Sequence, residues 1–221
     1  MKIQYDEYET EMAYDEFSDE QDSTIYFIRK NPITVILAMI NILIFLILEI
    51  MGDTENSQFM IDHGAVYPVL LQEQGQYWRL FTATCMHFGL MHLVNNMVML
   101  VATGQYLESA LGHFRFFLLY VIAGIGGSAL SYAQMLYSND YAVSAGASGA
   151  IFGIVGALLW VVIRNKGHYG TLTTRGLLVM IALCLYYGVT AGDVDNWGHI
   201  GGLIGGFVLC MILYHKKQQK Y

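Results

Sequence analysis

The stretch that decides the fold is YAVSAGASGAIFGIVG, residues 141–156. It places Ser148 at the front of a long apolar run of mostly small residues. Gly149 and Gly153 are four residues apart, a spacing that lets helix backbones approach closely inside a membrane. Ser148 therefore has two interpretations. Its hydroxyl either bonds a backbone carbonyl in a tight helix contact or attacks a substrate.

The composition is that of a membrane protein rather than of a soluble domain. Of the 221 residues, 55% are hydrophobic and 13% are charged, and the mean hydropathy is +0.44. The three cysteines, Cys85, Cys184 and Cys210, are odd in number and unrelated in spacing. We therefore expect neither a disulfide framework nor a metal site, and we interpret the cysteines as small hydrophobic residues.

Apolar segments recur six times, and the first has about the length that crosses a hydrocarbon core. The six segments are 33–51, 91–107, 116–137, 146–162, 177–191 and 198–214. We expect an all-α membrane protein whose helical domain covers residues 29–215, followed by a basic cytoplasmic tail at 216–221. Residues 1–28 hold half of the 18 acidic residues and are expected to form a solvated, disordered cytoplasmic tail, with a partner-binding segment as the alternative.

Lysine and arginine in the short connections predict the orientation in the membrane. They lie before the first segment, between the second and third, between the fourth and fifth, and after the last. These residues are Arg29, Lys30, Arg115, Arg164, Lys166, Arg175, Lys216, Lys217 and Lys220. Both termini are therefore expected in the cytoplasm, so that the second, fourth and sixth segments start at the outer surface.

Paired glycines in the sixth segment repeat the small-residue spacing of the fourth. They are Gly201 with Gly205 and Gly202 with Gly206. Because such faces permit close backbone contact, the fourth and sixth segments are expected to form the central pair of the bundle.

Polar side chains that lipid alone would not tolerate lie at the outer ends of three segments. His92 and Asn96 are four residues apart, so they share one helix face at the start of the second segment. Ser148 begins the fourth segment and His199 begins the sixth. Such groups normally face a cavity or a partner, and we expect these four at about the same depth.

These residue types suit nucleophilic catalysis. A serine hydroxyl is a weak nucleophile until a base removes its proton, and the His199 imidazole suits that role near neutral pH. Attack on an amide carbonyl places negative charge on its oxygen. The side chains of His92 and Asn96, with the N–H of Ser148 at a helix N-terminus, can bind that oxygen.

The loop before His199 holds two acids, Asp193 and Asp195. Solvated loop acids are the commoner interpretation of such residues, so a Ser148–His199 dyad is expected rather than a triad. GASGA also differs from the G-x-S-x-G turn of soluble hydrolases, so that fold is not implied.

At these residues the sequence resembles the rhomboid intramembrane serine proteases. The matching pieces are GASGAIFG around Ser148, His92 with Asn96, the upstream His87, YWRL at 77–80, Glu108, and GHIGG around His199. They follow in order over residues 77–206. The resemblance implies a rhomboid-like six-transmembrane-helix bundle with a water-filled site that opens outward.

The resemblance also implies roles for single residues. Ser148 is expected as the nucleophile, His199 as the general base, and His92, Asn96 and the Ser148 N–H as the oxyanion hole. Phe152 matches the position whose ring packs on the catalytic imidazole. The expected supporting residues are Phe152, Gly146, Gly149, His87 and Gly202. Trp78 and Arg79 belong to an amphipathic hairpin in the outer leaflet, Glu108 to a structural motif, and residues 192–197 to a lid.

The expected function is that of an intramembrane serine endopeptidase. It would hydrolyse peptide bonds in or next to transmembrane segments of other proteins, near the outer face of the plasma membrane. The expected partners are transmembrane substrates and the lipid bilayer, without nucleic acid, metal or small-molecule cofactor. Two alternatives remain: a noncatalytic rhomboid-like binder or chaperone, and a small transporter, although the two related halves typical of transporters are not visible.

Overall fold

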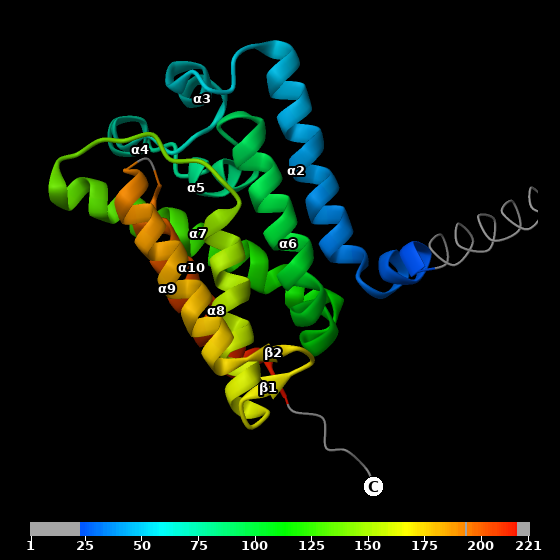
Figure 1. The fold of residues 1–221 in the computed structure, drawn as a ribbon. Coiled ribbons are helices and arrows are strands. Elements are labelled where there is room, and N and C mark those ends of the chain that lie inside the picture. Colours follow the sequence, from blue (N-terminus) through cyan, green and yellow to red (C-terminus); the bar gives the residue numbers. More distant parts are fainter. Residues whose placement is uncertain (1–22, 193, 216–221) are drawn as a thin grey trace, which may run out of the picture.

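The computed structural model describes residues 23–192 and 194–215, which form a bundle of helices (Figure 1). Its long helices are α2 (Pro32–Met51), α6 (Gly89–Leu111), α7 (His113–Ser138), α8 (Ser148–Arg164), α9 (Thr174–Ala191) and α10 (Asn196–Leu213). Each coincides, within a few residues at its ends, with one of the six expected segments. The all-α fold is therefore confirmed. Most of the expected N-terminal tail and all of the C-terminal tail lie outside the described residues, while residues 23–30 are helical.

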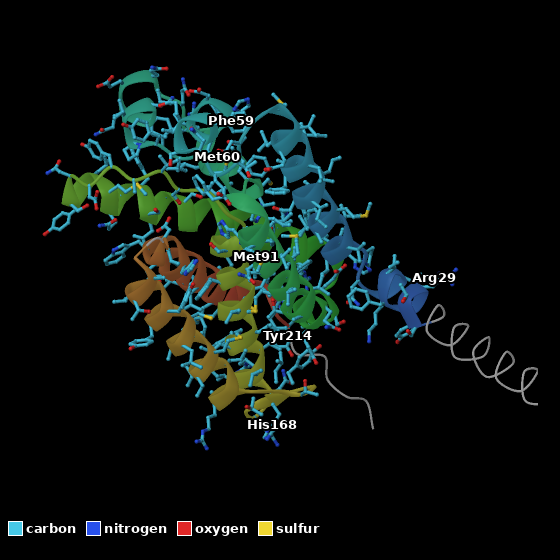
Figure 2. All side chains as sticks on the ribbon, turned by 45° about the horizontal axis from the view of Figure 1, so that its top comes forward. Arg29, Phe59, Met60, Met91, His168 and Tyr214 are labelled. Carbon is cyan, nitrogen blue, oxygen red and sulfur yellow. The ribbon has the colours of Figure 1, made fainter. Side chains whose placement is uncertain are left out.

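Short elements close the two ends of the bundle. Between α2 and α6 lie α3 (Ser57–His63), α4 (Pro68–Gln74), α5 (Arg79–Thr82) and the 3-10 helix η1 (Ala83–Cys85). Between α8 and α9, strands β1 (His168–Tyr169) and β2 (Leu172–Thr173) pair antiparallel. In Figure 2, Phe59 and Met60 of α3 lie at the opposite end of the bundle from His168 of β1. One end of the bundle is therefore built from short helices and the other from a β-hairpin.

The long helices differ in how apolar they are. Among the described residues, α2, α7, α9 and α10 are each long and apolar enough to cross a membrane. Helix α6 passes the same test only together with the α5–η1 segment, from which it is bent by 89°. Helix α8 is apolar but has 17 residues. Helix α6 is less apolar because it carries polar residues, among them His92, Asn96 and Glu108.

Glycine faces bring α8, α10 and α7 into backbone contact. A Cβ atom on Gly202 would collide with the carbonyl of Gly149, and one on Gly206 would collide with the carbonyl of Gly153. On the neighbouring face of α10, a Cβ atom on Gly201 would lie 3.0 Å from the carbonyl oxygen of Gly126 on α7. The expected central pairing of α8 with α10 is thus confirmed, and α10 packs its second glycine face on α7.

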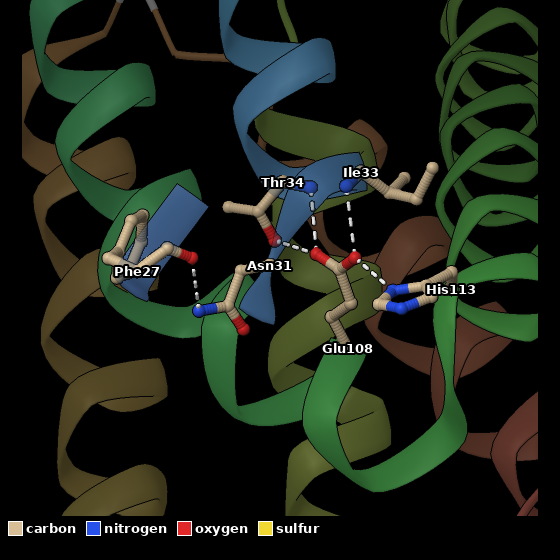
Figure 3. Close-up of polar contacts among 6 residues, drawn as sticks. All are labelled: Phe27, Asn31, Ile33, Thr34, Glu108 and His113. Atoms are coloured by element: carbon tan, nitrogen blue, oxygen red, sulfur yellow. Dashed lines mark hydrogen bonds and ion pairs between the residues drawn. The ribbon is translucent and has the colours of Figure 1, made fainter. Parts of the chain in front are cut away.

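Glu108, in the last turn of α6, caps the N-terminus of α2 (Figure 3). Its carboxylate is buried and accepts hydrogen bonds from the N–H groups of Ile33 (2.9 Å) and Thr34 (2.8 Å) and from the Thr34 hydroxyl (2.7 Å). Its Oε1 also lies 2.6 Å from Nδ1 of His113 on α7. The first N–H groups of a helix lack intrahelical acceptors and favour negative charge, which explains how a carboxylate is tolerated here. Glu108 therefore joins three helices.

Candidate active site

Ser148 is the first residue of α8, and Gly146, two residues before it, has an unusual backbone conformation. Gly146 has φ +148°, a conformation that residues with a Cβ atom rarely adopt. A Cβ atom there would also lie 3.0 Å from Cε1 and Nε2 of the His92 ring. The N–H of Gly146 donates to the carbonyl of Ala83 at 2.9 Å, which fixes this part of the backbone. Glycine is therefore required here both by conformation and by the closeness of His92.

His92 and Ser148 both lie close to the Cβ position built on Gly146. The Oγ of Ser148 lies 3.6 Å from the Cβ position built on Gly146, and the His92 ring lies 3.0 Å from it. The hydroxyl of the fourth segment and the imidazole of the second segment thus border one small volume. The structure brings these two sequence-predicted residues together.

His199 lies in the first turn of α10 and is only 7% exposed. Its ring stacks on Phe152 of α8, with centroids 4.1 Å apart and planes 6° from parallel. Phe152 is one helical turn after Ser148, so both point from the same side of α8. The stacking therefore directs the imidazole toward the face of α8 that carries Ser148.

Backbone contacts at the same level bring the two helix starts together. A Cβ atom on Gly149 would lie 3.5 Å from the carbonyl oxygen of Gly198, the residue before His199. One turn further along α10, Gly202 touches the carbonyl of Gly149. Ser148 and His199 thus occupy facing first turns of two helices in direct backbone contact.

Asn96 and His87 complete the surroundings of His92. Asn96 is buried one turn after His92, and its Nδ2 donates to the His92 carbonyl at 3.0 Å. Because an amide nitrogen carries two hydrogens, one donor of Asn96 is still available. His87 is fully buried, with its ring 5.2 Å from that of His92 and its Nε2 3.4 Å from the N–H of Ala147. His87 therefore supports the residue directly before Ser148.

The arrangement offers a hydroxyl, an imidazole and several N–H donors at one end of the bundle. Nδ1 of His199 is buried and has no hydrogen-bond partner within residues 23–192 and 194–215. No described carboxylate therefore holds the ring in the manner of a triad. In the described part of the chain, no three His, Cys, Asp or Glu side chains cluster in a way that could hold a metal ion.

Comparison with known proteins assigns the family. The family model described as the rhomboid domain matches residues 74–216, which include every residue placed in the site above. The chain belongs to the rhomboid family. With its apolar helices, it is a multi-pass membrane protein with an all-α bundle.

Relatives of this rhomboid occur in bacteria and plants. It is 40% identical to "Rhomboid protease GluP" of Bacillus subtilis (strain 168) over 178 residues, 80% of this chain and 34% of that protein. It is 40% identical to "RHOMBOID-like protein 5" of Arabidopsis thaliana over 153 residues, 68% of this chain and 48% of that protein. It is 33% identical to "Putative rhomboid protease YdcA" of Bacillus subtilis (strain 168) over 147 residues, 66% of this chain and 72% of that protein. The chain thus spans about a third of GluP and about half of RHOMBOID-like protein 5.

In this rhomboid, Arg79 holds the short helices α3 to α5 together. Its buried guanidinium donates through Nη1 to the carbonyls of Ile61 (2.5 Å) and Ala65 (3.0 Å) and through Nε to Gln76 Oε1 (2.7 Å). Its guanidinium carbon also lies 4.7 Å from the centre of the Trp78 ring, which is 52% exposed. The guanidinium thus has its hydrogen-bond partners inside the protein, while the indole beside it is exposed.

Asp195 is the residue whose importance the sequence interpretation missed. It was expected to be a solvated loop acid, and this is wrong, because its side chain is partly buried and hydrogen-bonded. It caps α10 by accepting from the Gly198 N–H at 2.7 Å, and its other oxygen accepts from the hydroxyls of Ser131 (2.5 Å) and Ser144 (2.6 Å). The preference for Asp immediately before a helix is the signal that could have indicated the cap. Asp193 lies outside the described residues, so the expected lid over residues 192–197 is described only in part.

Proposed function

We propose that this rhomboid is an intramembrane serine endopeptidase that acts through Ser148 and His199. The observation that carries the proposal is the stacking of His199 on Phe152, one turn from Ser148, between helices in backbone contact. A purely structural serine would need no buried imidazole in the facing turn of the neighbouring helix. The relative GluP, whose name describes a rhomboid protease, supports the same reaction class.

The proposed reaction has two halves. His199 takes the proton of the Ser148 hydroxyl while Oγ attacks the carbonyl carbon of the substrate peptide bond. The tetrahedral intermediate collapses, the C–N bond breaks, and the leaving amine takes the proton from His199. A water molecule, deprotonated by His199, then attacks the Ser148 ester. The second tetrahedral intermediate collapses, the carboxyl product leaves, and the serine oxygen takes the proton back from His199.

Negative charge on the carbonyl oxygen requires fixed donors. The N–H of Ser148 is available because it is the first of α8. The His92 ring borders the same volume as Ser148 Oγ, and Asn96 retains a second amide hydrogen one turn below. We assign these three groups to the oxyanion hole. Donors that are already in place reorganise little during the reaction, which makes them effective.

The proposed orientation puts the site near the outer face of the plasma membrane and both termini in the cytoplasm. Basic residues concentrate at the hairpin end, with Arg164 and Lys166 beside β1 and Arg175 at the start of α9. Acidic Asp53 and Asp62 lie at the opposite end, with α3. An excess of Lys and Arg marks cytoplasmic connections, so this distribution supports the orientation.

The proposed substrates are transmembrane segments of other proteins. Carbonyl groups inside a membrane helix are hydrogen-bonded, so a segment must unwind locally before Ser148 can attack it. Segments with glycine or other helix-breaking residues near the outer face should therefore be cleaved faster than uniformly helix-forming ones.

The proposal is tested by cleavage of a model transmembrane substrate in liposomes. The wild-type chain is expected to cleave it, Ser148→Ala and His199→Ala are expected to abolish cleavage, and Ser138→Ala, at an exposed serine at the end of α7, is expected to leave it unchanged. Binding of the substrate without cleavage by the wild type would favour a noncatalytic binder. Cleavage that persists fully in Ser148→Ala would contradict the proposal.

A further inference from the structure

Asp195 joins three parts of the chain that are far apart in sequence. One carboxylate oxygen accepts from the N–H of Gly198 at 2.7 Å in the first turn of α10. The other accepts from Ser131 on α7 at 2.5 Å and from Ser144, in the connection before α8, at 2.6 Å. A single N-cap needs only the first of these bonds. The two serine contacts require a further explanation.

The position of these contacts relates them to the proposed site. Ser144 is four residues before Ser148, and Asp195 is four residues before His199. The backbone of Ser144 is itself fixed, because it exchanges two hydrogen bonds with Val66 at 2.9 and 3.0 Å. The Ser144–Asp195 bond therefore connects the segments that lead into the two reacting residues.

Packing around Gly198 shows that the carboxylate occupies a tight place. A Cβ atom on Gly198 would lie 2.8 Å from Oδ2 of Asp195 and 3.0 Å from its Cγ. A methyl group at position 198 would thus press against the carboxylate, which is the movable end of the Asp195 side chain. The glycine before His199 and the acid three residues earlier are complementary in shape.

We propose that Asp195 is a positioning residue. Its carboxylate joins the segment that leads into Ser148 to the helix that carries His199, and so sets the distance between Ser148 and His199. The inference rests on the proposed function. Asp195 does not hold the imidazole by a hydrogen bond, since the Nδ1 atom of His199 has no hydrogen-bond partner among the residues that the structure describes, so we place its effect in the two segments that it joins. Small misplacements of reacting groups reduce rates strongly, about a hundredfold for 1 Å.

The proposal is tested by kinetics of substrate cleavage together with thermal unfolding in detergent. Asp195→Ala is expected to lower kcat about ten- to a hundredfold with KM within about twofold, because the geometry changes and substrate binding does not. Asp195→Asn is expected to recover most of the activity, since an asparagine caps helices as well as Asp and its amide can donate to the serine oxygens. Thr190→Ala is the matched control, because among the described residues the Thr190 hydroxyl bonds only carbonyls of its own helix.

Two further variants test whether Ser144 and Gly198 act on the rate through Asp195. Ser144→Ala is expected to lower kcat by a smaller factor and to add little in the Asp195→Ala background, since both variants remove the Ser144–Asp195 hydrogen bond. Gly198→Ala is expected to lower kcat in the wild-type background and to have little effect beside Asp195→Ala, where no carboxylate is displaced.

Three results would overturn the inference. An Asp195→Asn variant as impaired as Asp195→Ala would mean that charge, not position, matters. Losses that add fully in the double variants would mean that the residues act separately. Activity that falls only in step with the unfolded fraction would reduce Asp195 to a helix cap. A wild type without Ser148-dependent cleavage would instead contradict the proposed function, and the inference with it.

Discussion

The imidazole of His199 and the phenyl ring of Phe152 lie parallel, 4.1 Å between centroids and 6° between planes. A flat contact of this kind limits rotation of the imidazole about its side-chain bonds. The two residues belong to different helices, so the contact also couples the positions of α8 and α10. Phe152 therefore contributes to the proposed chemistry by orienting the base.

Removal of the Phe152 ring tests this role. Phe152→Ala is expected to lower kcat about fivefold, since an aromatic pair is worth about 1 kcal/mol and about 1.4 kcal/mol corresponds to a factor of ten. Phe152→Tyr, which keeps the ring, is expected to retain activity. The matched control is Phe207→Ala, because Phe207 packs edge-on against Trp160 of α8 further from the site, at 5.5 Å. Equal losses in Phe152→Ala and Phe207→Ala would show that the effect is packing alone.

The glycine contact between α8 and α10 is expected to govern stability. Gly202→Ala must separate the helices, because the new methyl group collides with the Gly149 carbonyl. Overpacking of this kind costs about 1–3 kcal/mol of unfolding free energy, so the thermal unfolding midpoint in detergent should fall. Gly126→Ala on α7, where a Cβ atom would meet nothing within 4 Å, should be neutral or slightly stabilising. An unchanged midpoint in Gly202→Ala would contradict the described contact.

Glu108 is expected to stabilise the end of the bundle that lies away from the site. Glu108→Gln places an amide donor against the N–H donors of α2, which costs about 1–3 kcal/mol of unfolding free energy. His113→Ala should cost less, about 1 kcal/mol or below, because the His113 side chain is 56% exposed. Thermal unfolding measures both. Cleavage well below the unfolding midpoint should be unchanged, and its loss in a folded Glu108→Gln variant would contradict a purely structural role.

Arg79 is expected to order the short helices beside the site. Arg79→Lys cannot reproduce the forked bonds to Ile61, Ala65 and Gln76, because an ammonium group is a single point donor. Hydrogen–deuterium exchange over residues 57–76 should therefore rise. Arg115→Lys is the control, since exposed Arg115 makes one described bond, to the Leu213 carbonyl at 3.3 Å. Equal exchange in the two variants would show that Arg79 does not hold this region.

The long helices and their central pair could be predicted from the sequence because both depend on local patterns. Apolar runs mark α2 and α7 directly, and the four-residue glycine spacing marks the contact of α8 with α10. The short helices α3 to α5 could not be predicted in this way. They are held by small apolar clusters around Met60 and Leu71 and by single polar contacts such as those of Arg79, and helices this short show no clear periodic signal.

The contacts of Asp195 and Glu108 show the same limit at the level of residues. Asp195 bonds serines 64 and 51 residues away, and Glu108 caps a helix that begins about 75 residues earlier. Only the folded bundle brings these partners together. Sequence patterns could therefore indicate Ser148, His199, His92 and Asn96 by their residue types and depth, but not the side chains that position them.

The most direct test of the central claim is mass spectrometry of the chain after reaction with a fluorophosphonate probe, which modifies activated serines. The account predicts modification at Ser148 in the wild type, none there in Ser148→Ala, and a rate lowered by orders of magnitude in His199→Ala. Modification of a different serine, or an unchanged rate at Ser148 without His199, would contradict it.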